Sequence, residues 1–224
     1  MQQYQQDFIE LAIKYEALSF GEFTLKSGRI SPFFFNAGQF NSGRALAAVG
    51  RCYASAIVHQ SSTQIPLDFD IIFGPAYKGI PLVSSVVVAL AEHHHRDLPY
   101  CFNRKEQKKH GEGGELVGAA IKGKRVLIVD DVITAGTAIR EVMAILDSHG
   151  AKAAGVVIGL DRQEKGSGEK EGSAVQEVRE RYQVPVVCVI TLKDIVDFLR
   201  QKQGNEQLVE RITKYQQQYG VAGV

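Results

Sequence analysis

Short apolar runs that alternate with segments of helical periodicity constrain the fold of this chain more than any other feature of its sequence. The apolar runs lie at residues 70–73, 99–102, 126–129, 153–160 and 184–191. The spacing of apolar residues predicts helices at residues 3–18, 42–60, 79–96, 136–148 and 192–218. Buried strands that alternate with helices indicate βαβ crossovers. The predicted fold is therefore α/β, with a central, mainly parallel sheet flanked by helices.

The N-terminal part of the chain departs from this pattern. Residues 20–35 are rich in aromatic side chains and are broken by Gly21, Gly28 and Pro32, which predicts short antiparallel strands joined by turns. Residues 163–172 are polar and are expected to form an exposed loop. The 224 residues fit a single domain, residues 1–224, at roughly 100–200 residues per domain.

The charge balance and the hydropathy pattern argue against several classes of protein. Lys and Arg number 26 against 25 Asp and Glu, a net charge of +1, so the composition gives no support for binding to nucleic acid or to an anionic membrane surface. The longest apolar stretch, Ile80–Ala91, is too short to span a bilayer. The first residues lack the basic and apolar regions of a secretory signal. The expected location is the cytoplasm.

The cysteines and the consecutive histidines are better explained by ordinary structure than by metal binding. Cys52, Cys101 and Cys188 are widely separated and show neither disulfide nor zinc spacing, so we interpret them as reduced, largely buried thiols. The histidines at residues 93–95 point in different directions on a helix, whereas metal ligands on a helix need a spacing of three or four. They are interpreted as a solvated helix end.

Residues 126–138 carry the strongest functional pattern. An apolar strand ends in Asp130 and Asp131, and a turn rich in small and hydroxyl residues then opens a helix. In parallel sheets, sites form beyond the carboxyl ends of the strands. Residues 134–138 can present backbone N–H groups and hydroxyls to a phosphate, while the carboxylates accept hydrogen bonds from sugar hydroxyls. The pattern predicts a site for the 5-phosphate end of a ribose.

A dense group of cationic residues follows the strand that ends at Phe102. The group consists of Arg104, Lys105, Lys108, Lys109 and His110. Cations at this density match a ligand larger than one phosphate, such as pyrophosphate. The glycines that end the segment at residue 114 suit a flap that closes and reopens. A solvated charged loop is the alternative, but the position beyond the carboxyl end of a strand favours a site.

Three further segments reach the same edge of the predicted sheet. Tyr77 and Lys78 follow a sharp Gly-Pro turn, and Lys78 could hold a phosphate oxygen, although the segment alone fits a simple turn equally well. Lys26 lies near the aromatic pair Phe34–Phe35, which suits a planar, anionic heterocycle. Taken alone, core aromatics explain that pair better. Arg162 follows a strand and could clamp a carboxylate.

Together these segments resemble the orotate phosphoribosyltransferases, enzymes of the type I phosphoribosyltransferase fold. Residues 129–137 are similar to the signature for phosphoribosyl diphosphate (PRPP) in that fold. The similarity that is specific to orotate lies in residues 26–35, 74–79, 104–114 and 160–162. The resemblance covers nearly the whole chain, and it implies a small N-terminal hood, about residues 1–40, over the base site.

The resemblance also implies a reaction and an assembly. The reaction is a pentosyl transfer in which orotate and PRPP form orotidine 5′-monophosphate and pyrophosphate, a step of pyrimidine (UMP) biosynthesis. Mg²⁺ would be held mainly through PRPP and water, with no direct protein ligand. The enzyme would be a homodimer whose active-site flap is shared across the interface.

The resemblance assigns roles to individual residues. The residues implied to bind PRPP are Tyr77, Lys78, Arg104, Lys105, Lys108, Lys109, His110, Asp130, Asp131, Val132, Ile133, Thr134, Ala135, Gly136, Thr137 and Ala138. Those implied in catalysis are Lys105, Lys108, His110, Asp130 and Asp131. Those implied to bind orotate are Lys26, Phe34, Phe35, Thr134 and Arg162.

Two other functions are compatible with the PRPP pattern. The first is a purine or uracil phosphoribosyltransferase that shares only the signature at residues 129–137. The second is a PRPP-sensing regulator that binds RNA or DNA and has lost catalysis. The near-neutral charge and the intact segment at residues 104–114 count against a regulator.

Overall fold

The computed structural model of the chain describes residues 1–62, 67–106, 114–133, 136–166 and 172–221. Within these residues the chain forms a six-stranded sheet and a separate two-stranded sheet. The strand order of the larger sheet is β5-β4-β3-β6-β7-β8, and its neighbouring strands are parallel except for β4 and β5. The prediction of an α/β fold with a mainly parallel sheet is confirmed.

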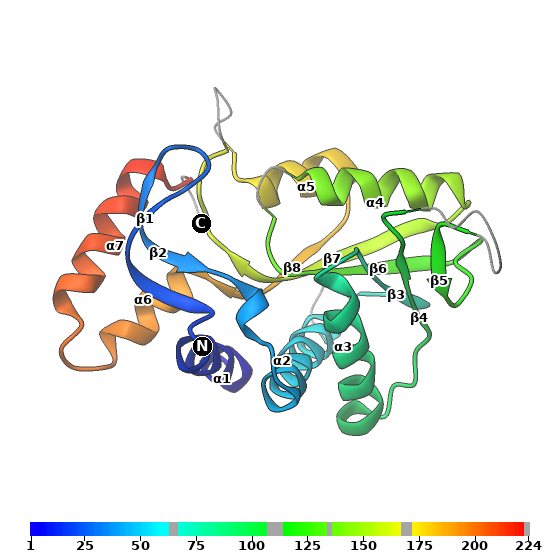
Figure 1. The fold of residues 1–224 in the computed structure, drawn as a ribbon, viewed down its shortest axis with the longest axis horizontal. Helices are drawn as coiled ribbons and strands as arrows, with labels where there is room; N and C mark the ends of the chain where they lie inside the picture. The colour runs from blue at the N-terminus through cyan, green and yellow to red at the C-terminus, as the bar shows by residue number, and fades with distance from the viewer. Residues whose placement is uncertain (63–66, 107–113, 134–135, 167–171, 222–224) are drawn as a thin grey trace.

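Helices cover both faces of the larger sheet (Figure 1). Its strands are β3 (Ile71–Gly74), β4 (Tyr100–Asn103), β5 (Leu116–Gly118), β6 (Arg125–Asp130), β7 (Lys152–Asp161) and β8 (Val186–Thr191). The helices on one face are α1 (Gln3–Lys14), α2 (Gly43–Ser61) and α3 (Gly79–His94). Those on the other face are α4 (Thr137–Ser148) and α5 (Ala174–Tyr182).

The central strand β6 shows why the sheet needs cover on both faces. Successive side chains of a strand point to opposite faces, so a continuous apolar run exposes apolar surface on each side. Leu127 and Val129 belong to the apolar core that includes α1, α2 and α3, whereas Val126 and Ile128 belong to the core that includes α4 and α5. All four side chains are fully buried.

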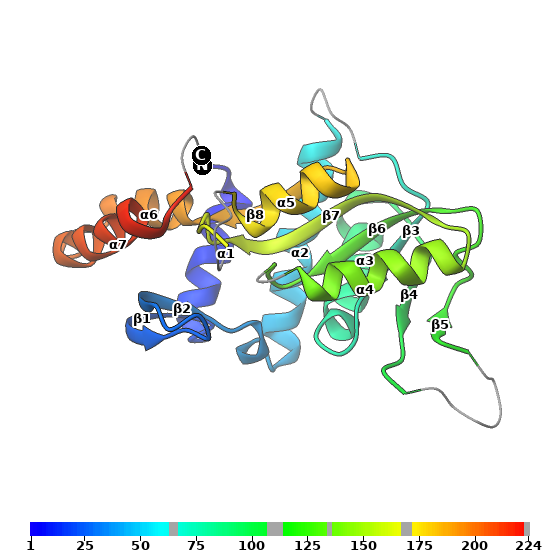
Figure 2. The ribbon, with the colours of Figure 1, turned by 90° about the horizontal axis from the view of Figure 1, so that it is seen from above.

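The two-stranded sheet packs against the C-terminal end of the chain. It consists of β1 (Leu18–Thr24) and β2 (Ile30–Phe35), and the last helices are α6 (Leu192–Arg200) and α7 (Glu206–Tyr219). Figure 2 shows these elements together at one end of the molecule. Arg211 of α7 donates a hydrogen bond of 2.8 Å to the Gly21 carbonyl, and the rings of Tyr215 and Phe33 meet edge to face at 6.3 Å. Segments that are far apart in the sequence therefore form one unit.

The first helix is shorter than the sequence pattern predicts. α1 ends at Lys14 instead of residue 18, because Glu16 adopts a left-handed backbone with φ 57° and Leu18 opens β1, where it pairs with Phe35. Leu18 fits helical spacing and strand alternation equally well. Pairing with β2 decides between them.

The structure contains elements that the sequence pattern does not predict. β5 is only three residues long and pairs antiparallel with β4. α5 is mostly polar, and only Val175 and Val178 are buried in it. A short 3₁₀ helix, η1 (Ala37–Gln39), follows β2. The prediction of an exposed loop is wrong at its start, because Gln163 is only 3% exposed; residues 167–171 lie outside the described residues.

The cysteines and histidines have the predicted surroundings. Cys52 and Cys101 are buried, Cys188 is partly buried, and all of them are free thiols. The run at residues 93–95 closes α3, where His95 has a left-handed backbone. Nowhere in the described part of the chain do three or more His, Cys, Asp or Glu side chains cluster as metal ligands. Among the described helices, none is both long and apolar enough to cross a bilayer.

Candidate active site

The segments selected from the sequence meet at one edge of the larger sheet. Parallel pairing aligns β3 with β4 and β6, and β6 with β7, so the residues that follow these strands lie at the same edge. Lys78 follows β3 and Asp131 follows β6, and Lys78 Nζ lies 2.8 Å from Asp131 Oδ2. The fold thereby joins two of the predicted site residues directly.

The carboxylates at the end of β6 are buried side by side. Asp131 accepts hydrogen bonds from Lys78 and from the backbone N–H of Val132, and Asp130 Oδ1 accepts the N–H of Asp131 at 2.8 Å. Burial and the neighbouring charge of Asp131 raise the pKa of Asp130 to about 7. The Tyr53 hydroxyl donates to the Asp130 carbonyl at 3.0 Å and fixes the strand end. Such a pair favours a ligand that donates hydrogen bonds or brings positive charge.

The turn after the carboxylates leads into the first turn of α4. Gly136 precedes the helix with φ 68°, a backbone conformation that favours glycine. Thr137 and Ala138 are exposed, and the N–H groups of a first helical turn lack acceptors within the helix. Residues 132–133 are half-buried, and residues 134–135 lie outside the described residues. The described part of the turn presents free N–H groups at the sheet edge, as an anion site requires.

The turn between β3 and α3 brings Lys78 to the carboxylates. Gly74 and Gly79 approach so closely that a Cβ on Gly74 would overlap the Gly79 carbonyl. The peptide bond between Ala76 and Tyr77 is cis, and Tyr77 is 66% exposed. Buried Asn103, at the end of β4, accepts the N–H of Ala76 at 2.8 Å. Asn103 is a site residue that the sequence reading missed; its position at a strand end was the available signal.

The cationic segment begins directly after β4. The backbone of Arg104 donates to the Glu115 carbonyl at 2.7 Å, and Lys105 Nζ lies 3.3 Å from Glu141 of α4. Both members of the Lys105–Glu141 pair are exposed, so the pair is weak. Three of the predicted residues lie outside the described residues, namely Lys108, Lys109 and His110.

The aromatic residues of β2 do not form the expected pair. Phe34 is 42% exposed and stacks on Phe23 of β1, with 5.5 Å between the ring centroids. Phe35 points to the other face of the strand and packs in the core against Phe8. Lys26 is exposed in the turn between the strands. The alternation of strand side chains therefore exposes the Phe34 ring to solvent, whereas the Phe35 ring is largely buried.

A cavity of about 420 Å³ is lined both by Asp131 and by Phe35, the last residue of β2. Its lining includes the charged residues Lys78 and Asp131 and the aromatic residues Phe35, Phe40 and Tyr53. Most of the lining is apolar. A mostly apolar cavity with a few polar groups is typical of a site for a small molecule.

Arg162 follows β7 and is held on several sides. Its Nη2 lies 2.7 Å from Glu164 Oε1 and donates to Ser31 Oγ at 3.1 Å, and its Cζ lies 4.2 Å from the centroid of the Phe33 ring. The structure thus places this cation against β2. Glu164 and Ser31 are contacts that the sequence reading missed, because they depend on residues far apart in the chain.

Comparisons with known proteins agree with this arrangement. The family model for the phosphoribosyl transferase domain matches residues 36–184. Orotate phosphoribosyltransferases of Cellvibrio japonicus and Saccharophagus degradans are 59% and 58% identical to this chain over 221 residues, which cover 99% of this chain and 99% and 100% of theirs. The crystal structure of orotate phosphoribosyltransferase from Francisella tularensis is 44% identical, with a TM-score of 0.85 over 95% of this chain and 98% of that one.

These matches extend over almost the whole chain. They include the N-terminal sheet and the C-terminal helices, which lie outside the region of the general domain model. The α/β arrangement is that of the type I phosphoribosyltransferases. The site at the sheet edge and the full-length matches lead to one conclusion: the chain belongs to the orotate phosphoribosyltransferase family.

Proposed function

We propose that this chain transfers the ribose 5-phosphate group of PRPP to N1 of orotate, which gives orotidine 5′-monophosphate and pyrophosphate in UMP biosynthesis. The observation that carries the proposal is the Lys78–Asp131 ion pair beside Asp130, because it joins the ends of β3 and β6 in one site for a sugar that bears anionic groups. Full-length similarity to relatives named orotate phosphoribosyltransferase supports orotate as the base.

The ribose 5-phosphate lies along the turn after β6 in this proposal. Asp130 and Asp131 accept hydrogen bonds from the ribose hydroxyls, which carboxylates do well. Residues 132–138 surround the 5-phosphate, with the N–H groups at the start of α4 directed at the anion. The sugar is thereby fixed at two points, and its C1 is presented to both reaction partners.

The cationic groups act on the leaving pyrophosphate. C1 of the ribose gains oxocarbenium character as its bond to pyrophosphate breaks and the bond to N1 of orotate forms. The electron pair leaves with pyrophosphate, so positive charge placed there lowers the barrier. The proposed groups are Arg104, Lys105, Lys108, Lys109 and His110, with Tyr77 and Lys78 beneath them. Because the Lys105–Glu141 pair is weak, Lys105 can exchange Glu141 for a phosphate oxygen.

The carboxylate pair fits a magnesium ion that enters with PRPP. Asp130 and Asp131 are adjacent, and burial together with the charge of Asp131 raises the pKa of Asp130. A cation nearby would relieve that repulsion. Mg²⁺ prefers oxygen ligands, keeps several waters and neutralises the diphosphate that departs. We propose that Asp130 and Asp131 hold it through ribose hydroxyls and water.

The base lies under a hood formed by about residues 1–40. Its proposed contacts are Lys26, Phe34, Phe35, Thr134 and Arg162. Orotate differs from uracil by one carboxylate, so a cation in the base site sets the preference. Arg162 beside β2 supplies that cation, and exposed Phe34 offers a ring surface for the heterocycle.

The assembly and location are also part of the proposal. Residues 1–224 act as one domain, and two copies form a homodimer in which the flap of each subunit reaches the site of the other. The free thiols Cys52, Cys101 and Cys188 suit the reducing cytoplasm.

The direct test is an assay of orotate consumption. Addition of PRPP to the protein, orotate and Mg²⁺ should remove the ultraviolet absorbance of orotate and release one pyrophosphate for each orotate consumed. Asp131→Asn should lower kcat/KM by roughly 100-fold, the typical cost of losing one group that stabilises the transition state. Unchanged orotate absorbance with folded wild-type protein would refute the proposal.

A further inference from the structure

Glu164 is nearly buried beside Arg162, and the reaction described above does not use it. Its Oε1 lies 2.7 Å from Arg162 Nη2 and accepts the Nε–H at 3.0 Å. The side chains of Glu164 and Arg162 are 11% and 15% exposed. A buried ion pair adds little net stability, because the cost of desolvation offsets the attraction. A functional reason for the pair is therefore needed.

The guanidinium of Arg162 is held on its other sides as well. Its Cζ lies 4.2 Å from the centroid of the Phe33 ring, and Nη2 donates to Ser31 Oγ at 3.1 Å. Within the part of the chain that the structure describes, Nη1 has no acceptor. These contacts orient the guanidinium through Nε and Nη2 and leave the hydrogen-bonding capacity of Nη1 unused among the described residues.

The backbone at Glu164 is tied to both ends of the chain. Glu164 and Gly220 form an antiparallel β-bridge, and the N–H of Lys165 donates to the Tyr219 carbonyl at 2.8 Å. Arg29, between β1 and β2, donates to the Lys165 carbonyl at 2.8 Å. Contacts with the C-terminal segment and the N-terminal sheet therefore fix the backbone position from which the Glu164 side chain extends.

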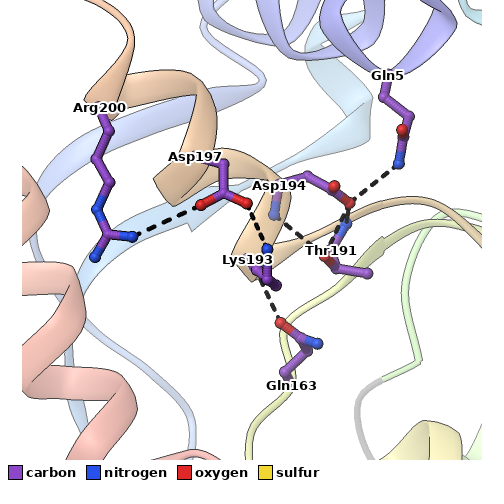
Figure 3. A network of polar contacts seen from close by, with 7 residues as sticks. All are labelled: Gln5, Gln163, Thr191, Lys193, Asp194, Asp197 and Arg200. Carbon is purple, nitrogen blue, oxygen red and sulfur yellow. Dashed lines mark hydrogen bonds and ion pairs between the residues drawn. The ribbon is translucent and has the colours of Figure 1, made fainter. Parts of the chain in front are cut away.

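Gln163 fixes the same turn to α6 (Figure 3). Its side-chain oxygen accepts the N–H of Lys193 at 3.0 Å, and its own N–H donates to the Asp161 carboxylate at 2.9 Å. Lys193 pairs with Asp197, and Figure 3 shows Asp194 in the same network at the start of α6. The carboxylate of Glu164 thus projects from a turn that is anchored on both sides.

We propose that Glu164 is a positioning residue for the base substrate: it holds Nε and Nη2 of Arg162 so that Nη1 is ready for the carboxylate of orotate. The inference rests on the proposed function, in which Arg162 binds that carboxylate. An arginine that is already oriented loses less conformational freedom when the ligand arrives. Glu164 also keeps the guanidinium paired when no orotate is bound, which avoids an isolated buried charge.

Three variants separate the position of the carboxylate from its charge. Glu164→Ala removes the carboxylate altogether. Glu164→Asp keeps the negative charge but moves it away from Arg162, because the side chain is one methylene shorter. Glu164→Gln keeps an acceptor oxygen in place but removes the charge. The Ala and Asp variants should raise the orotate KM by roughly 10-fold, the worth of one hydrogen bond to a charged group. The Gln variant should stay within about threefold of wild type, because the Nε–H keeps its acceptor. The KM of PRPP should not change in any of them.

The control variants test whether Glu164 affects orotate binding through Arg162. Arg162→Ala should itself raise the orotate KM, and the addition of Glu164→Ala should raise it no further, because the two residues act as one unit. Glu210→Ala breaks an exposed pair with Lys214 in α7 and should leave both KM values unchanged. If Glu164→Ala does not fold, the Asp and Gln variants keep a polar group at the position and carry the comparison.

The outcomes are distinguishable. Folded wild type that does not use orotate would overturn the proposed function and this inference together. Active wild type would leave the function in place, and the inference alone would be overturned by three results. The first is an orotate KM that stays unchanged in the Ala variant. The second is a wild-type orotate KM in the Asp variant together with an Ala-like orotate KM in the Gln variant. The third is a PRPP KM that rises as much as the orotate KM in the Ala variant.

Discussion

At the scale of single residues, a substitution of Gly136 tests whether its turn binds phosphate, once the effect on stability is controlled for. Its φ is 68°, and Gly150, beyond the other end of α4, has a φ of 65°. Alanine in this region costs roughly 1–2 kcal/mol, so both Gly→Ala variants should lose similar stability in urea denaturation. Only Gly136→Ala should also bind PRPP more weakly, because its N–H lies in the proposed phosphate turn. Equal PRPP affinity by calorimetry would contradict that placement.

The carboxylate of Asp130 predicts a pH dependence of stability without ligands. Folding raises the pKa of Asp130 from 3.8 to about 7, so between these values the folded protein holds a proton that the unfolded chain has released. Its contribution to stability is therefore full below about pH 4 and is lost as the pH rises through about 7. Asp130→Asn should flatten the fall in unfolding free energy between pH 5 and 8, measured in urea. Exposed Asp147→Asn is the control, and an equal slope in both variants would count against the shift.

Sequence patterns predict some site residues well and others poorly. Asp130 and Asp131 follow an apolar run directly, so their place at the sheet edge can be predicted from local order. Asn103 acts on Ala76, which is 27 positions away, and Arg162 bonds to Ser31, which is 131 positions away. Such partners depend on the tertiary fold, which local periodicity does not specify.

At the scale of elements, α7 supports the proposed base site through Tyr215. Its ring packs on Phe33, which lies against Arg162, and its buried hydroxyl makes no hydrogen bond of ordinary geometry among the described residues. Burial and the nearby charge of Glu164 raise the pKa of this hydroxyl. Tyr215→Phe should therefore not lower the free energy of unfolding. Tyr215→Ala should lower it by about 3–5 kcal/mol, as for other large aromatic truncations. Chemical denaturation measures both, and a Phe variant as unstable as the Ala variant would show that the hydroxyl is needed.

The strength of each local pattern decided which elements could be predicted. The long apolar runs at β6 and β7 are typical of strands that are buried on both faces of a parallel sheet, so they predict strands clearly. β5 has only Leu116 and Val117 as apolar residues and depends on its pairing with β4. The end of α1 depends on the pairing of Leu18 with Phe35. Elements that form only by pairing with a distant strand cannot be predicted from their own local sequence.

At the scale of the whole molecule, the proposed homodimer predicts complementation between damaged subunits. Lys108→Ala removes a cation of the flap, and Asp131→Asn removes a carboxylate of the sheet edge, so each variant alone should be nearly inactive. If the flap acts in the neighbouring subunit, a mixed dimer contains one intact site. Activity should then reappear after subunit exchange, and no recovery after verified exchange would argue against a shared flap.

The mainly parallel character of the larger sheet could be predicted from the sequence, whereas its strand order and the association of the chain ends could not. Alternating strands and helices restrict the topology, because crossovers between parallel strands follow few routes. The contacts of Arg211 with Gly21 and of Tyr215 with Phe33 join residues that are more than half of the chain apart. No periodic pattern identifies such pairs, and they build the part of the molecule that we propose holds the base.

The choice of base is the most direct test of the central claim. Orotate, uracil and hypoxanthine should be offered separately to the same protein with PRPP and Mg²⁺, and the nucleotide product of each should be quantified by chromatography. We expect orotidine 5′-monophosphate from orotate and at most a trace of product from the other two, because Arg162 beside β2 favours a carboxylate. Product from hypoxanthine or uracil, with none from orotate, would contradict the account.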